Sequence, residues 1–280
     1  MKRVLKKSIN DKLVKNNLWL NKLKKDCRNQ SVFFTIRNNQ IDFYHKGGRL
    51  FCFDNSGFKT HLKYASVITP KRKDYLTETE LSTYKLASNF EANYSRIKEN
   101  CKKYSGIEAL GVSNIYHKNS YLSNNNVVVL DIEISFESLN KENKQDRIDI
   151  LFFNKSTRTL QFVEAKHFSN NEIWSKNTPK VINQINRYES QIEKRKIEIL
   201  SEYKEYVKNI NKTFGKSLLE PIDIDEKVTL LIFGFDNDQK KGRLNELVIK
   251  NPEYKGIKLY AIGNIKKIET ENLWNAKELI

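Results

Sequence analysis

Two acidic residues and a lysine stand close together between residues 149 and 166. Asp149 lies within one apolar run, and a second apolar run ends in Glu164-Ala165-Lys166. Side chains alternate along a β-strand, so Glu164 and Lys166 share one face. If the two runs pair as a hairpin with its turn at 154–159, Asp149 comes onto that face too. Two carboxylates and an ammonium group held there could bind a divalent cation and activate a water beside it.

The donor types favour magnesium. Mg²⁺ prefers oxygen ligands and keeps several waters, so one or two carboxylates suffice. Asp149 and Glu164 would supply them, and the carbonyl of Ala165, which points sideways from its strand, could add a third oxygen. Lys166 would orient the attacking water or stabilise charge on a phosphate. A lowered pKa would instead let Lys166 act as a base, and the sequence leaves both roles open. We predict Mg²⁺, or Mn²⁺, as the cofactor.

The surroundings of these residues indicate burial. Ile148, Ile150 and Phe152 make one apolar face of the first run, and Leu151 and Phe153 extend the other. Strands that are apolar on both faces are typical of the centre of an α/β sheet. An isolated Glu-X-Lys is most often a surface ion pair, but a buried charge needs a partner or a metal.

The pattern Arg147-Ile148-Asp149, with Glu164-Ala165-Lys166 fifteen positions after the aspartate, resembles the PD-(D/E)XK nuclease superfamily. Ile148 replaces the usual proline, a frequent substitution there. Further on, Gln184 and Tyr188 stand at i and i+4 of an expected helix. This spacing is similar to the Q-X3-Y signature of the RecB-like branch, in which both residues help to place the nucleic-acid backbone and the active site. The resemblance spans roughly residues 85–265 in element order.

The resemblance implies a restriction-endonuclease-like α/β fold, with a mixed central sheet flanked by helices. It also implies metal-dependent hydrolysis of phosphodiester bonds, with catalytic roles for Asp149, Glu164, Lys166, Gln184 and Tyr188. The superfamily usually has another acid upstream, on the helix before the sheet. We prefer Glu91 for it, since Phe90, Tyr94 and Ile97 suggest an inward stripe beside it. The alternatives are Glu99, Asp131 and Glu133.

Composition points to a polyanionic partner. The chain has 280 residues, with 50 basic and 34 acidic side chains and a net charge of +16. Residues 1–30 hold ten Lys/Arg against two acids, a local net charge of +8. Such a surplus favours nucleic acid, through contacts of lysine with phosphate, although lysine-rich composition can also reflect an AT-rich genome. We expect DNA rather than RNA as the partner. A homodimer stays open, because members of the superfamily often dimerise to cut two strands.

Other sequence features indicate the compartment in which the protein is expected. No run approaches the length of a transmembrane helix. The three cysteines lack C-x-x-C spacing, which fits free thiols in a reducing compartment. We therefore expect a cytoplasmic protein with no membrane partner.

Two domains are expected. Residues 1–78 form a basic N-terminal helix and an accessory β-rich region, and residues 79–280 form the nuclease-like core. The N-terminal elements are a helix over 2–27 and strands over 32–36, 40–44 and 49–53. The core elements are a helix over 80–104, strands over 127–137, 146–153 and 160–167, a long helix over 180–212, a strand over 227–235, a short helix over 242–250 and a strand over 257–262.

These predictions favour a nuclease of restriction, repair or phage defence. The alternative is a catalytically inactive nucleic-acid-binding or scaffold protein on the same fold. A glycosidase-type acid pair is a poorer explanation, since a cationic surplus has no role there. Endonuclease or exonuclease action, sequence specificity and activation by a ligand or partner are not decided by the sequence.

Overall fold

The computed structural model describes residues 2–66, 86–136, 147–175 and 177–280. They form two compact units, which we call the N-terminal unit (Lys2–Ser113) and the C-terminal unit (Asn114–Ile280). The predicted domain boundary between residues 78 and 79 lies outside the described residues. Among the described helices, none combines the length and apolar character that a membrane span requires.

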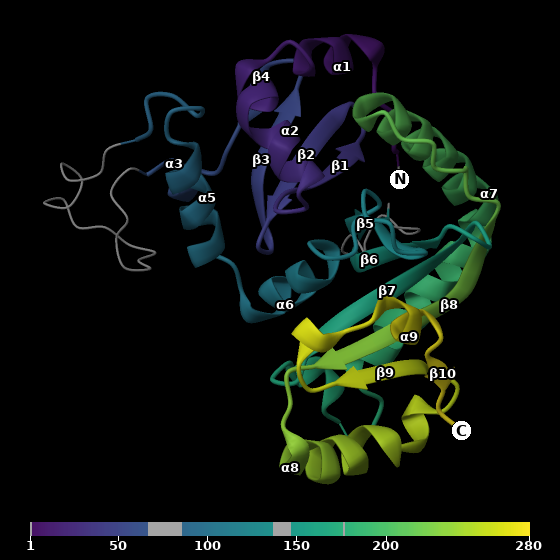
Figure 1. Ribbon diagram of the computed structural model, residues 1–280. Helices are drawn as coiled ribbons and strands as arrows, with labels where there is room; N and C mark the ends of the chain where they lie inside the picture. The colour runs from purple at the N-terminus through teal and green to yellow at the C-terminus, as the bar shows by residue number, and fades with distance from the viewer. Residues whose placement is uncertain (1, 67–85, 137–146, 176) are drawn as a thin grey trace, which may run out of the picture. The chain divides into compact units, whose positions relative to one another are not determined.

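The N-terminal unit is built on a four-stranded antiparallel sheet in the order β1-β2-β3-β4, with helical segments around it (Figure 1). Its elements are α1 (Lys7–Leu13), η1 (Trp19–Leu23), α2 (Lys24–Arg28), β1 (Phe33–Arg37), β2 (Gln40–His45), β3 (Gly48–Asp54), β4 (Gly57–Lys59), α3 (Leu62–Ala65) and α5 (Tyr94–Lys103). Another helix, α6 (Ile107–Tyr116), follows α5. The three predicted strands are confirmed, and β4 extends the meander.

The prediction of one helix over residues 2–27 is wrong. The side chain of Asn16 accepts a hydrogen bond from the backbone N–H of Leu18 at 2.9 Å. Such an Asx turn gives the backbone an alternative to helical bonding, so α1 ends at Leu13 and helical structure resumes at Asn17. In the second helical part Trp19 is buried, whereas Leu20 is 46% exposed.

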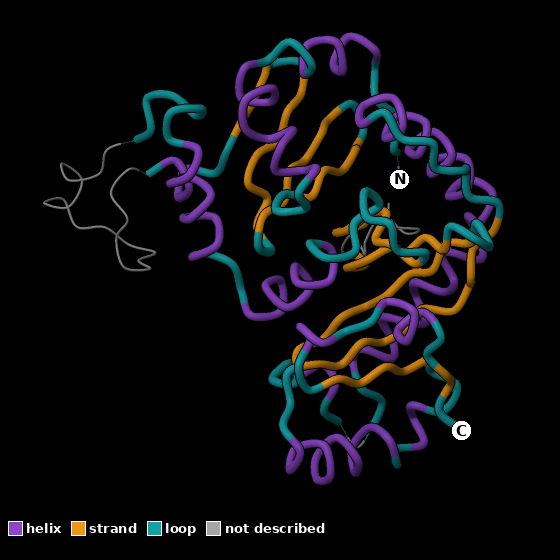
Figure 2. The backbone as a smooth tube through the Cα atoms, viewed as in Figure 1, coloured by secondary structure: helices purple, strands orange, loops and turns teal. Residues whose placement is uncertain are grey.

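The C-terminal unit contains a six-stranded mixed sheet in the order β10-β9-β8-β7-β6-β5 (Figure 2). Strands β7, β8 and β9 run parallel, and the other neighbouring pairs are antiparallel. The strands are β5 (Val127–Ser135), β6 (Arg147–Asn154), β7 (Thr159–His167), β8 (Asp223–Phe233), β9 (Lys258–Ile262) and β10 (Lys277–Glu278). The helical segments are η2 (Asn171–Ile173), α7 (Lys180–Phe214), α8 (Asn237–Gln239), the π-helix η3 (Lys240–Ile249), η4 (Pro252–Tyr254), η5 (Ile265–Lys267) and α9 (Thr270–Trp274).

The α/β character and the predicted order of three strands, long helix, strand, short helix and strand are confirmed in this unit. Strands β5, β6 and β7 form a continuous antiparallel series, and the long helix α7 connects β7 to its parallel neighbour β8. The apolar run at 228–233 is buried within β8, as expected for a covered strand. The sequence did not predict α6, α9 or the short edge strand β10.

Helix α7 is fastened to the sheet by polar contacts as well as by its apolar face. Tyr203 donates a hydrogen bond to the Asp131 carboxylate of β5 at 2.9 Å. Glu189 accepts one from the backbone N–H of Val228 in β8 at 3.0 Å. The helix stops at Gly215, whose φ of 66° is the left-handed cap conformation that glycine adopts without strain.

Candidate active site

Asp149 and Glu164 lie opposite each other on neighbouring strands. The antiparallel ladder of β6 and β7 ends with Ile150 facing Val163, and the next position on each strand is an acid. Side chains of directly opposed residues share a face of the sheet. At this point the Asp149 carboxylate, rather than a backbone carbonyl, accepts the next amide hydrogen, that of Ala165, at 2.8 Å. The predicted hairpin thus brings the two acids together.

The backbone N–H and C=O groups of Ala165 both face β6. The N–H and C=O of one residue in an extended strand point to the same side, which is why opposed residues can exchange both bonds. Since the Ala165 N–H points toward Asp149, its carbonyl also points toward β6. The oxygen suggested as a third ligand is therefore on the side of the two carboxylates.

Lys166 is clamped between two carboxylates. Its ammonium lies 2.9 Å from the Glu164 Oε1 and 2.6 Å from the Glu172 Oε2. The side chains of Lys166 and Glu164 are only 7% and 3% exposed, whereas that of Glu172 is 44% exposed. A buried ion pair flanked by a more exposed acid is the result.

Glu172 was not among the predicted site residues. It lies in η2, the short turn after β7, where the side chain of Asn170 accepts a hydrogen bond from its backbone N–H at 2.9 Å. Its only sequence signal is an acid six residues after Lys166 in a loop that follows the candidate strand. Loops often carry functional residues, but no periodicity marks which loop side chain turns back to the sheet.

The base role considered for Lys166 is not supported. Burial disfavours its charged form, but the charge of Glu164 and the hydrogen bond to Glu172 outweigh that effect, so the pKa of Lys166 is raised above its ordinary value. Lys166 is therefore an ammonium ion at neutral pH. This leaves the other predicted role, in which it orients a water or stabilises negative charge on a phosphate.

The two residues of the Q-X3-Y pattern are joined to each other and to β6. Gln184 donates a hydrogen bond to the Tyr188 hydroxyl at 2.5 Å, and Tyr188 donates one to the carbonyl of Arg147 at 2.6 Å. Tyr188 is fully buried. Arg147 begins β6 two residues before Asp149, so this chain of bonds fixes the backbone that carries the first acid.

Of the acids considered on β5, Glu133 is level with Asp149. The flanking pairs are Ile132 with Ile150 and Ile134 with Ile148, which sets Glu133 opposite Asp149. Its φ of 52° is unusual for a residue in a strand, and its carboxylate forms a 2.9 Å ion pair with Arg147.

Asp131 is enclosed although its strand lies at an edge of the sheet. β5 is indeed at the edge of the sheet, but Asp131 is fully buried. Its carboxylate accepts hydrogen bonds from Tyr203 and from the backbone N–H of Ile132 at 2.9 and 2.8 Å. Helix α7 covers this acid through Tyr203, a contact that was not predicted from the sequence.

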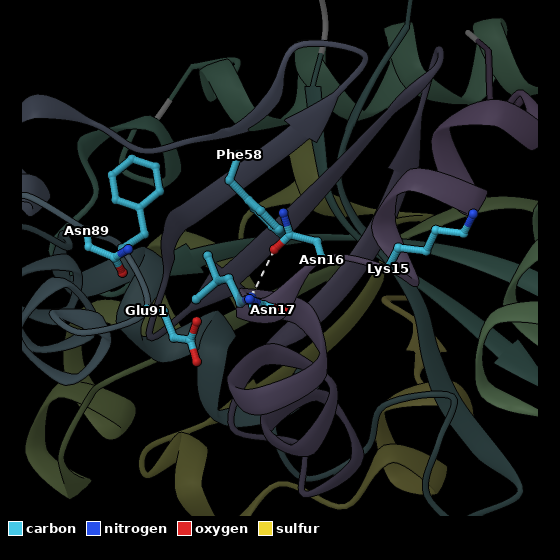
Figure 3. Close-up of a pocket in the computed structure, with 8 residues that line it drawn as sticks. Lys15, Asn16, Asn17, Phe58, Asn89 and Glu91 are labelled. Atoms are coloured by element: carbon cyan, nitrogen blue, oxygen red, sulfur yellow. Dashed lines mark hydrogen bonds between the residues drawn. The ribbon is translucent and has the colours of Figure 1, made fainter.

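Glu91 and Glu99 belong to the N-terminal unit. Glu91 lies in a turn that precedes α5, and it accepts a hydrogen bond from the Asn21 side chain at 2.8 Å. Figure 3 shows its carboxylate at a pocket of this unit. The pocket is lined by Lys15, Asn16, Asn17, Leu18, Phe58, Asn89, Phe90 and Glu91. Glu99 is exposed and pairs with Lys103 at 3.1 Å. A catalytic role for Glu91 stays a prediction.

The donor set suits a hard divalent cation. Within the described part of the chain, no three His, Cys, Asp or Glu side chains come close enough together to form a metal-binding group. A metal would thus be held by two carboxylates, those of Asp149 and Glu164, with the Ala165 carbonyl and water. This limited set of protein oxygens fits Mg²⁺, which usually keeps several of its waters.

Comparisons with known proteins identify no relative. No protein-family model matches the chain, and no curated protein or solved structure shows significant similarity to it. The resemblance to the PD-(D/E)XK superfamily stays a prediction.

Proposed function

We propose that this protein is a metal-dependent nuclease that hydrolyses phosphodiester bonds, with DNA favoured over RNA and a restriction-endonuclease-like core. The observation that carries the proposal is the meeting of Asp149, Glu164 and Lys166 where the β6–β7 ladder ends. Buried charges are costly unless they are paired or bind a metal. Glu164 and Lys166 are buried and Asp149 is half-buried, and their meeting where the ladder ends favours a chemical role.

Each residue has a distinct task in this proposal. Asp149 and Glu164 would hold Mg²⁺ or Mn²⁺, which when bound polarises the phosphate and lowers the pKa of a water. Lys166, kept cationic by Glu164 and Glu172, stabilises the negative charge that grows on the phosphate. Tyr188 holds the start of β6 through the Arg147 carbonyl and so keeps Asp149 in register.

The surface charge of the N-terminal unit supports a nucleic-acid substrate. Its first 28 residues bury an apolar side against the meander, as Leu13, Trp19 and Leu23 show. The exposed residues of this segment include Lys2, Lys6, Lys7, Lys12, Lys15, Lys22, Lys25 and Arg28. Such a cationic face suits the sequence-independent, salt-sensitive attraction of a phosphate backbone.

The first test is cleavage by Glu164→Gln, a change that keeps side-chain size and removes the charge. We expect cleavage of plasmid, linear duplex and single-stranded DNA, whichever the wild type cuts, to fall at least about 100-fold, because an interaction of the reacting centre is lost. Binding in chelator should stay within about twofold. Glu246→Gln is the matched control, since Glu246 is an exposed acid of the same unit paired with Lys250. Undiminished cleavage by Glu164→Gln, or wild-type cleavage in EDTA, would reject the mechanism.

An inactive binding or scaffold protein is the second candidate, favoured by the exposed cationic face described above. A melting experiment separates the two. Metal at about 100 times its dissociation constant stabilises a folded site by about 2.7 kcal/mol. Mn²⁺ should therefore raise the melting temperature of the wild type but not that of Asp149→Asn. An equal response from both proteins would favour the scaffold.

A further inference from the structure

The loop after β7 is held rigidly although it has little regular structure. Trp174 donates a hydrogen bond from its indole N–H to the carbonyl of Phe168 at 2.9 Å. Tyr254 donates one to the Ile173 carbonyl at 2.9 Å, and Asn251 donates one to the Ser175 carbonyl at 3.1 Å. These bonds fix the orientation of the Trp174 ring.

The Trp174 ring supports a cationic stack at the surface. The Arg243 guanidinium lies 4.3 Å from its centroid, and Phe168 meets it edge-on at 4.7 Å. Trp174 remains partly exposed and Arg243 is exposed. An exposed cation–π pair contributes only about 0.5–1 kcal/mol, so the stack adds little to the stability of the fold.

Arg243 comes from an unusual helix. It lies on η3, a π-helix of ten residues, and π-helical segments are rare and frequently found at functional sites. Lys240 and Lys241 on the same helix are also exposed. These two lysines are cations beside the stack that could contact a phosphate backbone.

Trp174 lies eight residues after the candidate catalytic cation, Lys166, and is linked to it by two short segments of the chain. Phe168, which holds the Trp174 indole, follows Lys166 by two residues, about 7 Å along an extended chain. From the other direction, Glu172 precedes Trp174 by two residues and contacts the Lys166 ammonium at 2.6 Å. A nucleotide with its phosphate at Lys166 would therefore have its base within reach of the stack.

We propose that the Trp174–Arg243 stack binds an unpaired nucleobase next to the scissile phosphate, so that the substrate is single-stranded or locally unpaired nucleic acid. This inference rests on the proposed nuclease function. Base stacking requires an accessible π-face, whereas a duplex presents its base edges in the grooves. Because every base has such a face, this contact gives little sequence preference.

Binding measured in EDTA tests the stack separately from cleavage. Fluorescein-labelled dT12, rU12 and a 12-base-pair duplex are titrated with the full chain, and anisotropy reports the affinity. Trp174→Ala should weaken dT12 binding about 5- to 150-fold, the range for loss of one base–aromatic stack, and change duplex binding less than about twofold. Trp174→Phe, which keeps a ring, should lose less. Comparing dT12 with rU12 shows which single strand the stack takes.

A charge-matched pair isolates the role of Arg243. Arg243→Gln removes one positive charge from η3, and Lys250→Gln removes one from the residue that follows it, but only the first removes the stack. We expect Arg243→Gln to weaken dT12 binding about two- to fivefold more than Lys250→Gln does.

Failure of the stacking inference can be distinguished from failure of the nuclease proposal. Equal loss on single strand and duplex, or no loss on dT12 and rU12 for Trp174→Ala, overturns the inference. A selective single-strand loss supports it even if the wild type proves unable to cleave, a result that would reject only the nuclease proposal. Circular dichroism of each variant confirms that a loss of binding is not a loss of folding.

Discussion

The ion pair of Lys166 and Glu164 makes a prediction that does not depend on catalysis. Replacing Lys166 by Met keeps the side-chain length and removes the cation, which leaves a carboxylate that is 3% exposed facing an apolar group. We expect this substitution to be strongly destabilising. The double variant Glu164→Gln/Lys166→Met should recover much of the loss, because it removes the stranded charge as well.

The magnitude follows from distance and burial. At the observed 2.9 Å an effective dielectric constant of about 20 gives an attraction of about 6 kcal/mol, against which stands the desolvation of both ions. Breaking a buried pair by removing one partner typically costs about 3–5 kcal/mol, whereas replacing both partners is often neutral or stabilising. Glu172→Gln, which removes the 44% exposed partner, should cost at most about 1 kcal/mol.

Urea denaturation of the wild type, both single variants and the double variant forms a thermodynamic cycle, with Glu172→Gln as the surface control. Recovery of at least about 2 kcal/mol in the double variant relative to Lys166→Met is the expected result. If Lys166→Met lies within about 1 kcal/mol of the wild type, or if the two single losses add, the pair is not the buried, coupled interaction that its geometry indicates.

Three further outcomes are expected from equilibrium unfolding. Tyr188→Phe should lower the free energy of unfolding by about 0.5–1.5 kcal/mol, since it removes the hydrogen bond to the Arg147 carbonyl, and should reduce cleavage in parallel; full stability would contradict this. Gly215→Ala should cost about 1 kcal/mol through its left-handed backbone, and no loss would count against the cap. Burial lowers the pKa of His45 to about 4 from about 6.5 in unfolded chains. The unfolded state therefore takes up the proton first, and about 3 kcal/mol of stability is lost as pH falls from 6.5 to 4; an equal loss in His45→Asn would refute this assignment.

The sequence predicted the C-terminal elements well because their signals are local. Nearly continuous apolar runs mark β6 and β7, and the turn between them has its own chemistry: the Asn154 side chain accepts hydrogen bonds from the backbone N–H groups of Ser156 and Thr157 at 3.0 and 3.1 Å. Such Asx turns are encoded within a few residues. The prediction of a single N-terminal helix was wrong because a turn of the same kind, at Asn16, interrupts a long amphipathic pattern.

Contacts between distant segments were harder to foresee. Glu172 meets Lys166 only because the loop after β7 folds back, and Asp131 is buried only because Tyr203, 72 residues away, reaches it from α7. The Trp174–Arg243 stack likewise joins a loop to a helix further along the chain. Neither secondary-structure propensity nor hydrophobic periodicity predicts such contacts, since both describe one segment by itself.

The spacing of the two acids could be interpreted because the hairpin converts sequence distance into register. Asn154 pairs with Thr159 at the turn, so each step back along β6 meets one step forward along β7, and a separation of fifteen positions sets Asp149 opposite Glu164. Each one-residue slip of an antiparallel pair exchanges the faces of a strand. One added residue in the turn would therefore set Asp149 against a different position of β7. The length of this turn thus determines whether the two proposed metal ligands face each other.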